Sequence, residues 1–290
     1  MGKPRLAIAL GSGSARGWAH IGVLQALQQA GIAPDIVCGT SIGAFVGAVY
    51  ASGKLDPLES WVRGLTRRDV FGYFDVTLEA GGLIKGEKLL GYTSRTFLGE
   101  TFADLDRPFA CVATDLASGR EVWLREGRII DAVHASVALP GLLAPHLLDE
   151  RYLVDGGLVN PVPVSLCRAL GADLVIAVDL GMDTVSLRPP GNDKPVPVPA
   201  WRQVMGRWLG RESDGEEVFR PSLADVVSNS IAIMQGRISR SRLAGEPADV
   251  LITPRLGQLG LLDFYRADQA IEAGHKATRH MLPLLHSLLE

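Results

Sequence analysis

This chain of 290 residues has few cysteines, few aromatic residues and little net charge. The three cysteines, Cys38, Cys111 and Cys167, are an odd number set in apolar segments. This argues against a disulfide framework and indicates small buried thiols in a reducing compartment. The 29 basic residues nearly balance the 32 acidic ones, for a net charge of −3. That balance, with no basic run, argues against nucleic-acid binding.

Long apolar runs are also missing. The first run, Leu6 to Leu10, is far shorter than the core of a signal peptide or a membrane-spanning helix. We therefore expect a cytoplasmic protein whose contact with a membrane, where it occurs, is peripheral. A hydrophobic content of 47% and a charged content of 21% are those of an ordinary globular protein, and the length suits one large domain or two small ones.

The chain does contain two glycine-rich turns, each after a short apolar segment. Residues 4–10 predict a buried parallel strand, and the turn GSGSARG at residues 11–17 follows it at once. A helix over residues 18–30 and a second strand over residues 35–38 complete a βαβ unit, whose crossover is almost always right-handed. Both turns should then emerge at the same carboxyl edge of the sheet, where open α/β folds keep their sites.

The second turn, GTSIG at residues 39–43, matches the nucleophile-elbow pattern GxSxG. A strand before it and a helix rich in Ala, Val and Gly after it are the context in which that pattern exposes a reactive serine. Gly39 and Gly43 leave room for the tight turn, and the amide end of the helix favours negative charge at Ser41. GxSxG also occurs by chance, and a turn with a capping serine is the alternative. We favour Ser41 as a nucleophile.

A serine hydroxyl is a weak nucleophile at neutral pH, so Ser41 needs an oxyanion hole. The first glycine-rich turn is suited to this, because such turns at a helix start point several amides into one concavity. We expect Gly13, Ser14 and Ala15 to be the donors.

The same turn also resembles the opening of a dinucleotide-binding fold, with Asp35 as the ribose ligand. Two details weaken that alternative. Arg16 stands where the third glycine of GxGxxG belongs, with Gly17 one place late, and Asp35 precedes its strand rather than ending it.

Ser41 also needs a base, for which the sequence offers a histidine or a carboxylate. Ser41, Asp155 and His275 follow the chain order of a hydrolase triad, but His275 falls in a helical pattern, whereas a triad histidine normally follows a strand. Asp155 ends a predicted strand, and Gly156 and Gly157 let the backbone bend so that the carboxylate can approach the serine. Partial burial would raise its proton affinity enough for a two-residue mechanism.

The rest of the chain alternates strand and helix patterns, and we expect a single domain over residues 1–290. Further strands are expected over residues 108–114, 121–124, 151–154, 173–179 and 250–253, and further helices over residues 55–65, 86–98, 129–138, 164–170, 223–243 and 263–289. Residues 71–83 are aromatic and glycine-rich and indicate a mobile or surface segment. Residues 183–220 are proline-rich at their start and nearly aperiodic, which indicates a mobile loop or a lid.

Four motifs, in this order, resemble those of the patatin-like phospholipases and lysophospholipases, especially bacterial members related to the catalytic domain of neuropathy target esterase. They are the loop at residues 11–17, in which Gly11, Arg16 and Gly17 support the donors, the elbow at residues 39–43, ASVALPG at residues 135–141, and DGG at residues 155–157. The resemblance covers about residues 4–182 and resumes at residues 248–254 and 263–268. One departure is serine at positions 12 and 14, where many relatives carry glycine.

The resemblance implies a three-layer α/β fold, with a central, mostly parallel sheet flanked by helices and a nucleophile elbow after an early strand. It implies a dyad of Ser41 and Asp155 that hydrolyses acyl esters of phospholipids or lysophospholipids through an acyl-serine, without a catalytic histidine, a metal ion or a cofactor. Two alternatives stay open: an esterase with a Ser-His-Asp triad, and a weakly active regulatory or scaffold protein of the same fold. The natural lipid and the oligomeric state, a monomer or an oligomer, are left open by the sequence.

Overall fold

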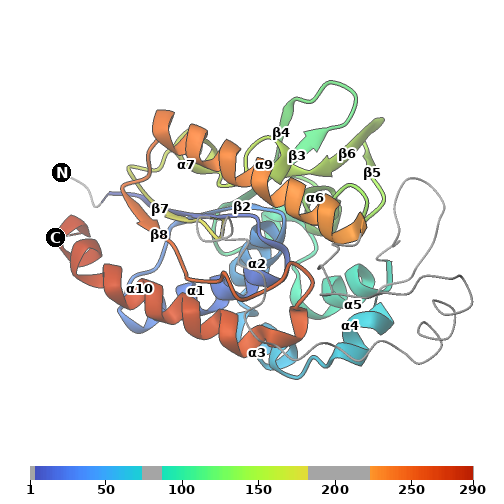
Figure 1. The fold of residues 1–290 in the computed structure, drawn as a ribbon. Helices are drawn as coiled ribbons and strands as arrows, with labels where there is room; N and C mark the ends of the chain where they lie inside the picture. Colours follow the sequence, from blue (N-terminus) through green and yellow to red (C-terminus); the bar gives the residue numbers. More distant parts are fainter. Residues whose placement is uncertain (1–3, 74–86, 182–222, 290) are drawn as a thin grey trace, which may run out of the picture.

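One eight-stranded sheet organises the computed structural model, which describes residues 4–73, 87–181 and 223–289 (Figure 1). The strands are β1 (Leu6–Leu10), β2 (Ile36–Thr40), β3 (Phe109–Asp115), β4 (Glu121–Leu124), β5 (His146–Leu148), β6 (Arg151–Asp155), β7 (Leu174–Val178) and β8 (Val250–Ile252). Their order is β5-β6-β3-β2-β1-β7-β8, and β4 also pairs with β3. The strands from β3 through β2, β1 and β7 to β8 are parallel, whereas β4, β5 and β6 form antiparallel pairs. The predicted parallel sheet is confirmed, with an antiparallel margin.

Both faces of the central strands are buried. In β1, Leu6, Ile8 and Leu10 belong to one core cluster, while Ala7 and Ala9 belong to a second cluster on the opposite face. Successive side chains of a strand point to opposite faces, so a strand covered on both sides has no polar position. This burial is why the segment is a continuous apolar run in the sequence.

Helices cover the two faces of the sheet. They are α1 (Ala19–Gln29), α2 (Ile42–Ala51), α3 (Leu55–Arg63), α4 (Arg67–Tyr73), α5 (Glu87–Phe97), α6 (Ile129–Val137), α7 (Val164–Ala169), α9 (Leu223–Gly245) and α10 (Ala267–Leu289), with 3-10 turns η1 (Ser14–Trp18), η2 (Phe102–Asp104), η3 (Gly156–Leu158) and η4 (Phe264–Arg266). Residues of α1, α2, α3, α6 and α10 join the first cluster, and residues of α7 and the end of α9 join the second. In Figure 1, α1 and α10 lie below the sheet and α7 and α9 above it. The arrangement is the three-layer α/β fold expected.

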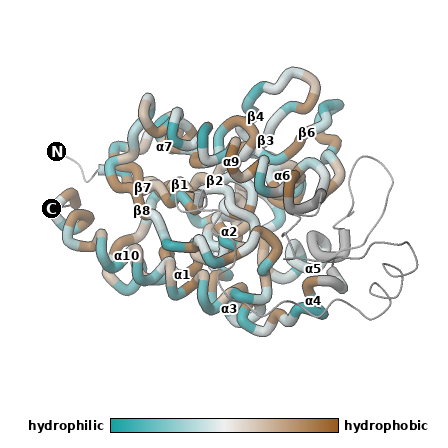
Figure 2. Tube along the Cα trace, in the orientation of Figure 1, coloured by the Kyte–Doolittle hydropathy of each residue, from teal (hydrophilic) through white to brown (hydrophobic). Residues whose placement is uncertain are grey.

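The two helices below the sheet, α1 and α10, pack backbone against backbone. A Cβ at Gly22 would lie 2.0 Å from the carbonyl oxygen of Ile271, and a Cβ at Gly274 would lie 2.0 Å from that of Ala19. Figure 2 shows α10 alternating between teal and brown along its length, as expected of a helix with one buried face. This contact ties the helix that follows the first glycine-rich turn to the C-terminal part of the chain.

Two short elements differ from the sequence prediction. Helix α4, Arg67–Tyr73, was not predicted, and its last three residues begin the segment 71–83 that is expected to be mobile or at the surface. Strand β5 has three residues, too few to show a period of two, and it joins β6 through Asp149 and Glu150, which have positive φ angles of 47° and 62°. The segment 183–220 lies outside the described residues. Among the helices of the described ranges, none is both long and apolar enough to cross a bilayer.

Candidate active site

The register of β3 brings the ends of β2 and β6 together. Strand β4 pairs with residues 111–114 of β3, β2 with residues 109–112, and β6 with residues 113–115. Since β4 overlaps both partners, β2 and β6 must share the other edge of β3, one directly after the other. Thr40, the last residue of β2, pairs with Val112, and Asp155, the last of β6, pairs with Ala113. The residue after Thr40 is Ser41, so the register accounts for its meeting with Asp155.

Ser41 occupies the tight turn between β2 and α2. Its φ of 58° and ψ of −127° are a backbone conformation that residues other than glycine rarely adopt. Ser41 is also the N-cap residue of α2. The hydroxyl Oγ donates a hydrogen bond of 2.5 Å to Oδ2 of Asp155. Both residues are buried, at 8% and 1% exposure. The hydroxyl is thus aimed at a buried carboxylate from the positive end of a helix dipole.

The environment of Asp155 strengthens it as a base. Burial raises the pKa of its carboxyl to about 6, although the hydrogen bonds from Ser41 and from the amide of Gly157 each lower it. The Gly157 amide donates to Oδ1 at 2.7 Å, and Oγ1 of Thr114 donates to the main-chain oxygen of Asp155 at 2.9 Å. One carboxylate oxygen is therefore fixed by the main chain, and the other faces the serine.

Three glycines permit this approach, because each packs directly against main-chain atoms. A Cβ at Gly39 would lie 2.4 Å from the carbonyl oxygen of Gly43, and a Cβ at Gly43 would lie 2.1 Å from that of Leu10. A Cβ at Gly156 would lie 2.2 Å from the carbonyl oxygen of Val112. No side chain fits at these distances, so the glycine requirement predicted around Ser41 has a specific steric cause.

The structure distinguishes among the three expected oxyanion donors. Gly13 and Ser14 line the same cavity as Ser41. Their main-chain amides donate no hydrogen bond to another residue in the described part of the chain. Ser14 has a φ of 52°, which turns the loop at this point. The amide of Ala15, by contrast, donates to the carbonyl oxygen of Leu261 at 3.0 Å. Gly13 and Ser14 therefore remain the donor candidates, and Ala15 instead anchors the loop.

Gly11, Arg16 and Gly17 hold the loop in place. The amide of Gly11 donates a hydrogen bond of 3.0 Å to the carbonyl oxygen of Val178. The guanidinium Nε of Arg16 donates to the carbonyl oxygen of Leu259 at 2.8 Å, and burial lowers the pKa of Arg16. A Cβ at Gly17 would overlap the side chain of Ile42, the residue after Ser41. These contacts fix the loop against β7, the C-terminal segment and the elbow.

The position of Asp35 does not suit a ligand of a ribose. Its carboxylate accepts a hydrogen bond of 2.8 Å from the amide of Leu6, at the start of β1. It is therefore at the amino edge of the sheet, opposite the carboxyl edge that carries the glycine-rich loop, which does not fit the dinucleotide alternative.

His20 of α1 is a residue of the site that the sequence did not single out. The side chain is fully buried, and Nε2 lies 2.8 Å from the carbonyl oxygen of Gly11. Because a carbonyl only accepts, the ring must donate from Nε2, and burial lowers the pKa of His20 to about 4, which keeps it neutral. His20 thus fixes the start of the glycine-rich loop through Gly11.

Ser136 is a second residue that the sequence did not single out, although it lies within the motif at residues 135–141. Its hydroxyl donates to the carbonyl oxygen of Val112 at 2.7 Å and accepts from the amide of Ser41 at 2.9 Å. Ser136 is fully buried in α6. It therefore ties the elbow to β3, the strand that also positions Asp155.

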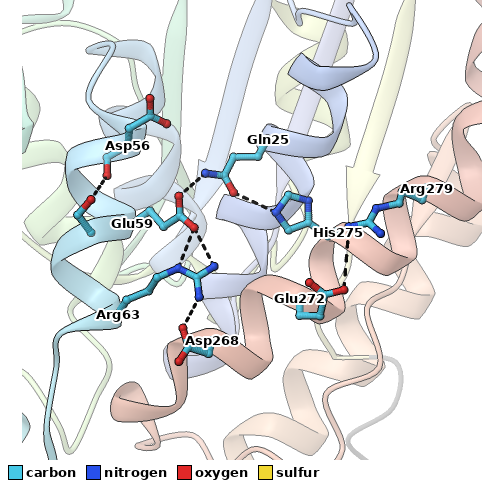
Figure 3. A network of polar contacts seen from close by, with 9 residues as sticks. Gln25, Asp56, Glu59, Arg63, Asp268, Glu272, His275 and Arg279 are labelled. Carbon is cyan, nitrogen blue, oxygen red and sulfur yellow. Dashed lines mark hydrogen bonds and ion pairs between the residues drawn. The ribbon is translucent and has the colours of Figure 1, made fainter.

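His275, the triad alternative, belongs to another network. Figure 3 shows its ring beside Gln25, whose side chain also reaches Glu59. The distance from Nε2 of His275 to Oε1 of Gln25 is 3.1 Å. Glu59 in turn bonds Arg63, so the network joins α1, α3 and α10. The structure does not bring His275 to Asp155, whose carboxylate oxygens bond Ser41 and Gly157.

An apolar cavity of about 150 Å³ opens over Ser41 and Asp155. Its apolar lining comes from α2, α3, α6, α9 and the segment before α10, and includes Phe45, Trp61, Val133, Val137, Ile231 and Phe264. Such a lining fits an acyl chain. Within the described ranges, no group of three His, Cys, Asp or Glu side chains could hold a metal ion.

The chain is similar to known proteins along most of its length. The family model described as patatin-like phospholipase matches residues 8–168. An NTE family protein of Mycobacterium tuberculosis is 33% identical, covering 93% of this chain and 89% of that protein. The chain belongs to the patatin-like phospholipase family. Lysophospholipase NTE1 of Pyricularia oryzae is 30% identical over 93% of this chain, which spans only 18% of that protein. Among solved structures, VipD from Legionella pneumophila aligns with a TM-score of 0.48 and 15% identity, over 97% of this chain and 67% of that one.

Membership in the patatin-like phospholipase family confirms the resemblance that the four motifs carry. It supports a phospholipase or another lipid hydrolase and identifies the three-layer arrangement as the patatin fold. The motif at residues 155–157 and the elbow both lie within the matched range, as does Ser136. The catalytic assignment of Ser41 and Asp155 remains a prediction.

Proposed function

We propose that the protein is a serine hydrolase of lipid acyl esters, with Ser41 as the nucleophile and Asp155 as its base. The observation that carries this proposal is the 2.5 Å hydrogen bond between their side chains at the N-terminus of α2. The pKa of Asp155, raised by burial to about 6, supports the role of a base near neutral pH. No histidine takes part in the proposed dyad.

In the acylation step, Oγ of Ser41 attacks the ester carbonyl carbon while its proton passes to Asp155. The negative charge that develops on the carbonyl oxygen is bound by the amides of Gly13 and Ser14. The tetrahedral intermediate then collapses, the bond to the leaving alcohol breaks, and the alcohol oxygen takes the proton from Asp155. The products of this half-reaction are an acyl-serine and a free alcohol.

In the deacylation step, a water molecule replaces the leaving alcohol. Asp155 takes one proton from the water as its oxygen attacks the acyl carbonyl, and the same two amides bind the new oxyanion. Collapse of the intermediate breaks the bond to Oγ, which recovers the proton from Asp155. The fatty acid leaves and Ser41 is regenerated, so the cycle consumes one water and needs no other reactant.

The substrate class follows from the cavity and from family membership. An apolar cavity above the dyad favours an acyl chain, and relatives named as lysophospholipases support a phospholipid or lysophospholipid ester. Each methylene buried gains about 0.8 kcal/mol, so the preference for chain length should be graded rather than absolute. We expect the protein to meet this substrate in the cytoplasm and to contact membranes only peripherally, which co-sedimentation with phospholipid vesicles would test.

A series of p-nitrophenyl acyl esters tests the proposed chemistry. We expect the wild-type protein to hydrolyse them and Ser41→Ala and Asp155→Asn to be inactive, while His275→Ala retains activity if its fold is intact by circular dichroism. Activity that survives Asp155→Asn but is lost in His275→Ala would instead favour a triad. A wild-type protein without activity would favour the regulatory or scaffold alternative.

A further inference from the structure

One amide side chain lies in the otherwise apolar wall that α9 contributes to the cavity. Gln235 lines the cavity together with Ile231 and Ala232 from the same helix and with Ser41 and Asp155 from the sheet side. It also borders a smaller neighbouring cavity behind the glycine-rich loop. A polar group at this position is not needed to bind an acyl chain, so its hydrogen-bonding capacity requires an explanation.

The two ends of the Gln235 amide have different surroundings. Oε1 accepts a hydrogen bond of 3.3 Å from the hydroxyl of Ser12. Nε2 lies against Gly157: a Cβ built there would be 2.4 Å from Nε2 and 2.9 Å from Oδ1 of Asp155. Nε2 and the Asp155 carboxylate are therefore neighbours across Gly157. Among the described residues, no hydrogen bond uses Nε2 as its donor.

The proposed mechanism determines which part of the substrate lies beside Gln235. The leaving alcohol takes its proton from Asp155, so its oxygen must be next to that carboxylate when the ester bond breaks. Gln235 lies next to that carboxylate across Gly157, so the group attached to this oxygen can reach its amide. The apolar lining from α2 and α6 is the part of the cavity that suits the acyl chain.

We propose that Gln235 is a specificity residue whose side-chain amide donates a hydrogen bond to an oxygen of the glycerol moiety in the leaving alcohol. The inference rests on the proposed function, because it needs Asp155 beside the leaving oxygen. It assigns to this site a preference for esters of glycerol, whose neighbouring carbon carries an oxygen, over esters of simple alcohols. A site that hydrogen-bonds a substrate hydroxyl discriminates against the analogue that lacks it.

Two lysophosphatidylcholines with the same palmitoyl chain test the proposal, one natural and one lacking the hydroxyl on the second glycerol carbon. For the wild-type protein, we expect kcat/KM to be about 10-fold higher for the natural substrate, the effect of one hydrogen bond. In Gln235→Met, which keeps the length of the side chain but not its amide, this ratio should fall to about one.

A second variant keeps the shape of Gln235. Gln235→Glu retains an oxygen for Ser12 but removes the donor near neutral pH, so the substrate ratio should fall here too. A second carboxylate beside Asp155 should also move the apparent pKa of kcat/KM upward, because like charges disfavour ionisation. A purely structural role for Gln235 would predict neither change. Asn229→Met, which removes an exposed amide from the same helix outside the cavity, is the matched control and should leave the substrate ratio unchanged.

Several results would overturn the inference. An unchanged substrate ratio in Gln235→Met, with activity present, would show that Nε2 does not bind the glycerol oxygen. An equal loss on both substrates with a lowered Tm would show that Gln235 only supports the fold. Failure of the proposed function is distinguishable, because Ser41→Ala or Asp155→Asn would then remain active on both substrates, whatever the ratio. A wild-type protein inactive on both would contradict the function and, with it, this inference.

Discussion

On the sheet side of the cavity, the glycines beside Ser41 and Asp155 pack against main-chain atoms, whereas on the α9 side Gln235 is held by the side chain of Ser12. Gly43 and Gly156 touch carbonyl oxygens of neighbouring strands and allow no added atom. Helix α9, by contrast, is attached by side-chain bonds, such as the one from the hydroxyl of Ser239 to Asp179 at 2.8 Å.

Under the proposed function, this difference separates the residues of the reaction from the residue of specificity. A dyad held by the register of a buried sheet cannot move without disturbing that sheet, so the reaction geometry is nearly invariant to changes elsewhere. A wall held by side chains can change one residue at a time. The comparison therefore predicts large effects for substitutions on the sheet side and small, substrate-dependent effects on the α9 side.

The largest effect is expected from Gly43→Ala on the sheet side. A Cβ there would lie 2.1 Å from the carbonyl oxygen of Leu10, so the elbow must shift, at a cost on the order of 4 kcal/mol. The fraction of the Gly43→Ala variant that stays soluble should have a kcat/KM about 100-fold below that of the wild type, since a shift of about 1 Å misplaces Ser41. Gly47→Ala, one turn later in α2, meets only side chains at 3.1 Å and is the matched control, expected to stay within about 1 kcal/mol of wild type. Equal urea-unfolding free energies for the two variants would contradict the comparison.

Asp155→Asn should make the protein more stable while it abolishes activity. Because burial raises the pKa of Asp155 to about 6, the folded wild-type protein binds more protons than the unfolded chain between about pH 4 and pH 6, and its stability falls as pH rises through that window. The asparagine has no charge to bury, so its advantage should be on the order of 3 kcal/mol at pH 8 and absent below about pH 4. Thermal unfolding across this pH range checks the prediction; an advantage that is independent of pH would contradict it.

Ser136→Ala should have an intermediate effect. It leaves the amide of Ser41 and the carbonyl oxygen of Val112 without their buried partner, which costs about 2 kcal/mol. We expect a lower kcat with KM little changed, because the elbow and not the acyl cavity is disturbed. Ser165→Ala, a serine of α7 that bonds Asn160 outside the cavity, serves as a control that should leave kcat unchanged. A raised KM with a normal kcat in Ser136→Ala would show that Ser136 does not act through Ser41.

The smallest effect is expected on the α9 side. Arg242 of α9 bonds Glu121 of β4 at 2.6 Å, and both side chains are partly exposed to solvent. Arg242→Gln should therefore lower the free energy of unfolding by only about 0.5 kcal/mol. Arg237→Gln, exposed on the same helix, should change it less. A loss from Arg242→Gln as large as that from Gly43→Ala would remove the distinction between the two walls.

Elements with local causes could be predicted from the sequence. Strand β4 has the predicted bounds, and the elbow around Ser41 follows from a strand, two glycines and a helix that are adjacent in the chain. The buried cysteines Cys38, Cys111 and Cys167 were also predicted, because each stands among apolar neighbours.

Features that depend on register between distant segments could not be predicted. The resemblance implied that Ser41 meets Asp155, but the register that brings them together, with β2 and β6 sharing one edge of β3, is recorded in no local pattern. Likewise, Ala15 lies in the same loop pattern as Gly13. Its amide is not a candidate donor because it bonds the carbonyl oxygen of Leu261, which is far along the chain. Sequence reasoning identified the residue types of the site but not which of their atoms are free.

The central claim, that Asp155 alone activates Ser41, is tested most directly by the pH dependence of Ser41 labelling with a fluorophosphonate, located by mass spectrometry. We predict a labelling rate that rises with pH through an apparent pKa of about 6, that is lost in Asp155→Asn, and that is retained in His275→Ala. Labelling of Ser41 at the wild-type rate in Asp155→Asn, or its loss in a folded His275→Ala protein, would contradict the account.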